Sequence, residues 1–75
     1  MRKQPAPRIG VIGTGFVARH FVMELMHRKD YRLGRVLTRR PVASCTDFPV
    51  PDALTMSPDQ LLAGSDIVFE CTGDV

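Results

Sequence analysis

The sequence predicts an α/β fold built on a parallel sheet, and three observations support this prediction. Short runs of branched apolar residues recur along the 75-residue chain, stretches with helical patterning lie between them, and a glycine-rich turn joins the first run to the first helical stretch. Parallel neighbouring strands need a crossover connection, which is usually a helix, so this alternation favours parallel pairing. We expect four strands in the order 3-2-1-4, with the first strand between the second and the fourth.

The first strand and the turn after it carry the clearest signal. Residues 8–12 form a β-branched run typical of a buried strand, and residues 13–18 match the spacing Gly-x-Gly-x-x-Ala. Gly13 lets the chain turn sharply, Gly15 lets the backbone approach a pyrophosphate, and Ala18 lets the new helix pack closely on the strand. This pattern predicts a dinucleotide site of the Rossmann type, and the alternative is a strand, turn and helix without a ligand. The candidate binding residues of the turn are Gly13, Thr14, Gly15, Phe16, Val17 and Ala18.

A helix is expected directly after the turn. Its charged residues Arg19, Glu24 and Arg28 fall outside the apolar face and remain for solvent. Lys29 and Asp30 are expected to close it. The apolar face that should pack on the sheet consists of Ala18, Phe21, Val22 and Leu25.

The residues at the end of the second strand favour NADP(H) over NAD(H). We predict this strand at residues 33–38, and its end faces the adenosine ribose, where an acidic side chain about 20 residues beyond the glycines accepts hydrogen bonds from the 2′-hydroxyl. Here that place holds Thr38, followed by Arg39 and Arg40. A carboxylate would repel a 2′-phosphate, whereas two guanidinium groups can pair with it. The alternative is that both arginines only solvate a loop.

The rest of the chain continues the alternation. A short third strand is expected at residues 53–56. Ser57 is predicted to be a helix N-cap, with Pro58 at the first helical position and Gln60 completing a capping box. Gly64 should end this short helix.

A fourth strand at residues 67–69 should bring the chain back to the candidate site. It is expected beside the first strand, so its end stands at the crevice where a bound dinucleotide extends toward its nicotinamide. The residues that could contact the cofactor there are Cys71, Thr72 and Gly73.

Composition and charge argue against other classes of protein. The chain is 44% hydrophobic and 24% charged, without an apolar run long enough to span a bilayer or the apolar core of a secretion signal, so we expect a cytoplasmic protein with no membrane partner. All ten Lys and Arg residues lie at or before Arg40. No helix-turn-helix, RNA-recognition or zinc pattern accompanies this basic half, so nucleic acid is not an expected partner.

Two histidines and two cysteines are interpreted as non-catalytic. His20 and His27 are about two helical turns apart, which is too far for one metal ion, so no metal site is expected. Cys45 and Cys71 lie outside any C-x-x-C arrangement and are expected to be free thiols without a catalytic role.

Length sets the expected domain organisation. A complete doubly wound nucleotide domain needs roughly twice 75 residues. We therefore expect residues 1–7 to be a flexible N-terminus and residues 8–75 to be the N-terminal part of a dinucleotide-binding domain that is cut after its fourth strand.

From Arg8 onward the chain resembles the glucose-fructose oxidoreductase and inositol dehydrogenase family, in the segments 9–21, 37–40 and 65–73. The resemblance implies a two-domain, often oligomeric NAD(P)-dependent oxidoreductase that passes hydride between nicotinamide and a carbinol or related carbon. It also implies an acid-base Lys that follows a further helix and strand. The Glu-Cys-Thr-Gly ending at 70–73 is similar to that of homoserine dehydrogenase-like or aspartate dehydrogenase-like relatives, so the substrate class stays open.

Three functions remain open at this point. The first is the NADP(H)-binding part of an oxidoreductase with a small polar substrate, for which NAD(H) is the alternative cofactor and a homo-oligomer an implied assembly. The second is a non-catalytic module that senses a nucleotide. The third is a Rossmann domain for S-adenosylmethionine or FAD, against which the two arginines argue because neither ligand has a 2′-phosphate.

Overall fold

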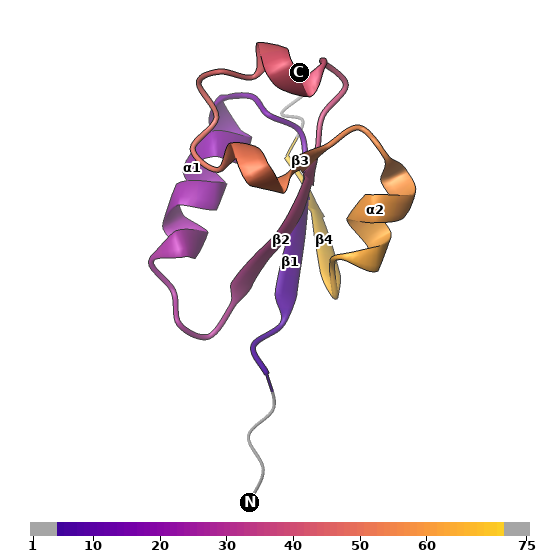
Figure 1. Ribbon diagram of the computed structural model, residues 1–75. Coiled ribbons are helices and arrows are strands. Elements are labelled where there is room, and N and C mark those ends of the chain that lie inside the picture. The colour runs from indigo at the N-terminus through magenta and orange to yellow at the C-terminus, as the bar shows by residue number, and fades with distance from the viewer. Residues whose placement is uncertain (1–4, 72–75) are drawn as a thin grey trace, which may run out of the picture.

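The computed structural model describes residues 5–71, which form four strands and two α-helices (Figure 1). The strands are β1 (Arg8–Ile12), β2 (Arg32–Leu37), β3 (Leu54–Thr55) and β4 (Ile67–Glu70). The α-helices are α1 (Phe16–Met26) and α2 (Pro58–Ala63). Two 3-10 helices, η1 (Val42–Ser44) and η2 (Pro51–Ala53), lie in the connection between β2 and β3.

All four strands are parallel and form one sheet in the order β3-β2-β1-β4, which confirms the predicted α/β class and strand order. The arrangement is a Rossmann-like half-sheet. Helices α1 and α2 lie on opposite sides of it (Figure 1). The order of the strands reverses at β1. Strands β2 and β3 are added on one side of β1, and the chain then crosses over and adds β4 on the other side.

The register places the carboxyl ends of three strands at one level. Ile12 of β1 is paired with Leu37 of β2 and with Glu70 of β4. Residues paired in this way project from the same face of a sheet. The last residues of β2, β1 and β4 therefore form one row across the sheet.

The core lies between α1, the sheet and the β2–β3 connection. Val11, Val22 and Val36 are completely buried there. Of the four residues predicted for the packing face of α1, Ala18, Val22 and Leu25 are buried, which confirms that face. Phe21 is only partly buried and stacks on Phe69 with 5.2 Å between ring centroids.

On the other side of the sheet, α2 packs closely on β1. A Cβ atom at Gly10 would collide with the side chain of Ser65, which follows α2. Glycine is therefore required at this position of the strand, because no larger residue leaves room for the end of α2.

The helix boundaries differ from prediction at one place. Helix α1 ends at Met26, not at the predicted 29–30, because the backbone N–H groups of His27 and Arg28 turn back to the carbonyls of Glu24 and Leu25. These shorter bonds tighten and close the last turn.

The predicted capping box of α2 is half right. Ser57 is the N-cap, and its hydroxyl accepts a hydrogen bond from the Gln60 N–H at 3.2 Å. The Gln60 side chain does not bond back to the Ser57 N–H. Instead, the Thr55 hydroxyl accepts from that N–H at 3.1 Å and donates to Gln60 Oε1 at 2.6 Å.

Strand β4 forms the outer edge of the described sheet, and all four of its residues are exposed. A hydrogen-bonded ion pair fixes its beginning: Arg8 Nη2 lies 3.2 Å from Asp66 Oδ1, and the Arg8 N–H donates to Asp66 Oδ2 at 2.7 Å. Neither α-helix in residues 5–71 is long and apolar enough to cross a membrane.

Candidate functional site

The turn after β1 has the conformation that its first glycine permits. Gly13 has a φ of 117°, which L-residues with a side chain rarely adopt. Its N–H donates to the Leu37 carbonyl at 2.9 Å, so the turn is attached to the end of β2. The chain can therefore leave β1 abruptly and start α1 four residues later.

The start of α1 is open to a ligand. Gly15 is the N-cap of this 11-residue helix and offers no side-chain cap. Apart from the two residues next to Gly15 in the chain, no heavy atom of the described residues lies within 4 Å of where its Cβ would be. The space beside Gly15 is therefore open at the helix N-terminus, where the positive end of the helix dipole lies.

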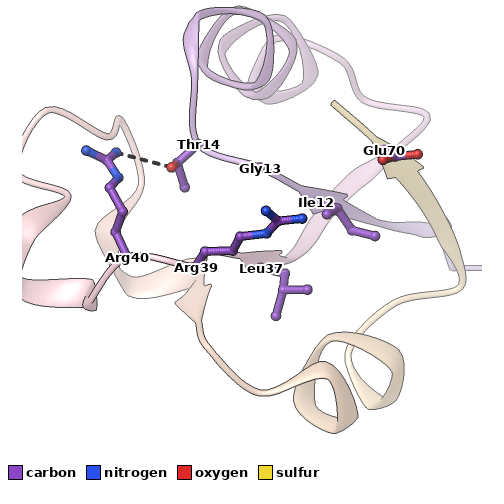
Figure 2. A pocket seen from close by; sticks show the side chains of 7 residues that line it. All are labelled: Ile12, Gly13, Thr14, Leu37, Arg39, Arg40 and Glu70. Carbon is purple, nitrogen blue, oxygen red and sulfur yellow. Dashed lines mark hydrogen bonds between the residues drawn. The ribbon is translucent and has the colours of Figure 1, made fainter. Parts of the chain in front are cut away.

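A cavity of about 470 Å³ lies at the carboxyl ends of β1, β2 and β4 (Figure 2). Ligands of open α/β sheets bind in this place, where the strand order reverses, and the volume is in the range of about 300–1,000 Å³ found for ligand pockets. The lining residues are Ile12, Gly13, Thr14, Leu37, Arg39, Arg40 and Glu70.

The two arginines line this cavity in different ways. Arg40 Nη2 donates to the Thr14 hydroxyl at 3.1 Å, so this guanidinium is bonded to the glycine-rich turn. The Arg39 side chain extends into the cavity (Figure 2). No hydrogen bond or ion pair joins the Arg39 guanidinium to any other residue between 5 and 71.

Thr38 shapes the loop and does not line the cavity. It is 3% exposed, and its hydroxyl accepts from the Arg40 N–H at 3.0 Å and donates to the Arg40 carbonyl at 3.2 Å. The sulfur of buried Cys45 lies 3.5 Å from the same hydroxyl. A buried threonine thereby fixes the backbone that carries both arginines.

The remaining predicted residues of the turn are not brought to the cavity wall. Phe16 and Val17 are exposed on the first turn of α1, and the Phe16 ring lies 4.2 Å from the His20 ring. Ala18 is fully buried against the sheet, as close packing of the helix requires. Only Gly13 and Thr14 of this predicted group line the cavity.

At the end of β4, Glu70 lines the cavity, whereas Cys71, the one described residue of the three predicted there, does not. Cys71 is half-buried against the core, and its N–H donates to the Ile12 carbonyl at 2.8 Å. Burial raises the pKa of the Cys71 thiol, and the neighbouring Glu70 carboxylate raises it further, which disfavours the nucleophilic thiolate. Thr72 and Gly73 lie outside the described residues.

Sequence reasoning missed three lining residues, which are Ile12, Leu37 and Glu70. Each is the last residue of its strand, and the register aligns all three on one face. Alternation along the strand predicts opposite faces for Glu70 and Cys71, but only the register between β4 and β1 shows that Glu70 is on the face of the cavity.

Some charged residues outside the cavity form surface ion pairs. Arg19 lies 2.8 Å from Asp47, and Arg28 lies 2.8 Å from Asp30. Among residues 5–71, no group of three His, Cys, Asp or Glu side chains could hold a metal ion. The cavity brings Arg39 and Arg40 together with Gly13 of the glycine-rich turn, which gives it positive charge beside exposed backbone.

Comparison with protein-family models, with curated proteins and with solved structures finds no match for this chain. The Rossmann-like character of the chain therefore rests on its own parallel sheet and strand order.

Proposed function

We propose that this chain binds NADP(H) as part of an oxidoreductase that acts on a small polar substrate. One observation carries the proposal: a single cavity at the carboxyl ends of the strands is lined by Gly13 of the glycine-rich turn and by the Arg39 side chain. A dinucleotide with a 2′-phosphate needs both features, one for its diphosphate and one for the additional phosphate.

The residues present fit such a ligand. The uncapped start of α1 and the open space at Gly15 suit a diphosphate, because backbone N–H groups can approach it without a Cβ in between. Arg39 supplies a planar, permanently charged donor at the end of β2. When bound, the nicotinamide cofactor supplies hydride transfer, while this chain's residues bind and orient it.

The absence of an acid at the end of β2 favours NADP(H) over NAD(H). At the sequence position where a carboxylate would be expected to bind the ribose 2′-hydroxyl, this chain has Thr38, which is buried and whose hydroxyl is bonded to the Arg40 backbone. Positive charge follows directly at Arg39 and Arg40. Such a loop attracts a 2′-phosphate and gives a bare ribose no carboxylate acceptor.

Calorimetric titration of the full chain with NADPH and NADH tests this proposal. We expect NADPH to bind more tightly, and Arg39→Ala to weaken NADPH by about 10- to 100-fold with little effect on NADH, since one charge-assisted phosphate contact is lost. Arg28→Ala is the matched control, because it removes the same charge from a surface ion pair with Asp30.

Each outcome has a distinct meaning. Equal affinity for both cofactors would contradict the role of Arg39, and absence of binding to either by the folded chain would overturn the proposal. NADPH binding without turnover of any hydroxy or carbonyl compound in the whole protein would favour the nucleotide-sensing alternative over an enzyme.

A further inference from the structure

Adjacent arginines on one loop have different surroundings in this structure. Arg39 extends into the cavity with no bonded partner among residues 5–71, whereas Arg40 reaches across to Thr14 (Figure 2). The hydrogen bond between Arg40 Nη2 and Thr14 Oγ1 joins residues that are 26 positions apart in the sequence. It therefore connects the loop after β2 with the glycine-rich turn after β1.

The Arg40 end of this connection is firmly held. The Arg40 N–H donates to the Thr38 hydroxyl at 3.0 Å, and the same hydroxyl donates to the Arg40 carbonyl at 3.2 Å. Because Thr38 is buried, the backbone of Arg40 has little freedom to move. The Arg40 guanidinium is thus a hydrogen-bond donor whose backbone is held in place by Thr38.

At the other end of the Arg40–Thr14 hydrogen bond, the glycine-rich turn is held by fewer hydrogen bonds. One residue earlier, the Gly13 N–H donates to the Leu37 carbonyl at 2.9 Å. Beyond that bond, the space at the Cβ position of Gly15 is open. The bond from Arg40 is the side-chain contact that fixes Thr14, immediately before the N–H groups that would bind a diphosphate.

We propose that Arg40 is a positioning residue that clasps the glycine-rich turn through Thr14, and that Arg39 alone discriminates between cofactors by contacting the 2′-phosphate. This inference rests on the proposed function. A turn that is ordered before binding loses less conformational freedom when a ligand arrives. Since the diphosphate is common to both cofactors, the clasp should strengthen NADPH and NADH binding by the same factor.

Thr14→Val tests the clasp most cleanly, because it removes the acceptor oxygen and leaves every charge in place. We expect this variant to weaken NADPH and NADH equally, by about three- to tenfold, with an unchanged preference for NADPH. Thr14→Ser retains the hydroxyl and should bind like the wild-type chain. Thermal unfolding followed by circular dichroism checks that each variant is folded at the temperature of titration.

A double-mutant cycle with NADH completes the test, since NADH has no 2′-phosphate for either arginine to contact. Arg40→Ala should weaken NADH as much as Thr14→Val does, and the double variant should be no weaker than either single variant. Additive losses, or an Arg40→Ala loss confined to NADPH, would show that Arg40 contacts phosphate and would overturn the clasp. Failure of the wild-type chain to bind either cofactor would remove the proposed function and the clasp together, whereas additivity with normal binding removes the clasp alone.

Discussion

At the scale of single residues, the two glycines of the turn have separate tasks. Gly13 adopts a φ of 117°, whereas Gly15 has an ordinary φ of −77° and open space at its Cβ position. The first glycine is needed for the fold, because a side chain at such a φ is strained. The second is not required by packing, so we expect it to serve the proposed ligand, because a Cβ there would approach an incoming phosphate.

Alanine substitutions separate these two tasks. Gly13→Ala should lower the free energy of unfolding by about 1–3 kcal/mol, the usual range for a strained backbone conformation. Gly15→Ala should lower it by less than about 1 kcal/mol, the loss of a preferred N-cap residue, yet weaken NADPH binding. Urea unfolding and calorimetry measure the two quantities, and a stable Gly13→Ala variant would contradict the structural role of this glycine.

At the scale of elements, local signals explain which parts of the fold were predictable. The bounds of β1 and α2 agree with prediction, because the first is set by a β-branched run and the second by Ser57, Pro58 and Gly64. The end of α1 was wrong by three or four residues, since nothing in its sequence specifies the tightened last turn. The 3-10 helices η1 and η2 were missed, because burial of Cys45 and Phe48 in the core orders that connection.

The same reasoning applies to the candidate site. The glycine spacing and the paired arginines are local, so Gly13, Thr14, Arg39 and Arg40 could be named from sequence and do line the cavity. Glu70 was missed because its position depends on the register between β4 and β1, which are 55 or more residues apart. The different bonding of the two arginines also depends on a long-range contact.

At the start of α2, the Thr55 hydroxyl links the Ser57 N–H to the Gln60 side chain, and this hydrogen-bond relay gives a test at the scale of elements. Thr55→Val removes the hydroxyl that accepts from the Ser57 N–H and donates to Gln60 Oε1, with almost no change in side-chain volume. We expect the free energy of unfolding to fall by about 1 kcal/mol, because the half-buried Ser57 N–H loses its acceptor, whereas the exposed Gln60 Oε1 keeps its contact with Arg35. Thr55→Ser keeps the hydroxyl and should lose less, and equal losses in both variants would show that the relay contributes nothing.

At the scale of the whole molecule, β4 is joined to the rest of the sheet by its pairing with β1 and by the contact of Asp66 with Arg8. Hydrogen bonds from the Arg8 side chain and backbone lower the pKa of the Asp66 carboxyl below its ordinary value of 3.8. A carboxyl with a lowered pKa in the folded state stabilises the fold above its unfolded pKa, and this contribution is lost as the pH falls through the folded pKa.

This linkage predicts how acid acts on the molecule. The urea midpoint of the wild-type chain should fall as the pH is lowered from about 4, the ordinary pKa of a carboxyl, toward 2. Asp66→Asn should make that decline shallower, and Arg8→Met should do so to a smaller extent, because the backbone N–H of residue 8 still donates to the Asp66 carboxylate. The Arg28–Asp30 pair, in which the Asp30 pKa is also lowered, should leave a residual decline. An undiminished decline in Asp66→Asn would contradict the assignment.

The measurement that tests the central claim most directly is an NMR titration of the isotope-labelled chain with NADPH, following each backbone amide. The cavity at the carboxyl ends of the strands predicts that the amides of residues 13–18 and 38–40 shift on binding. The amide chemical shifts at the opposite end of the sheet, near Arg32 and Asp66, should not change. Shifts centred on that opposite end, or no shifts at saturating NADPH, would contradict the account.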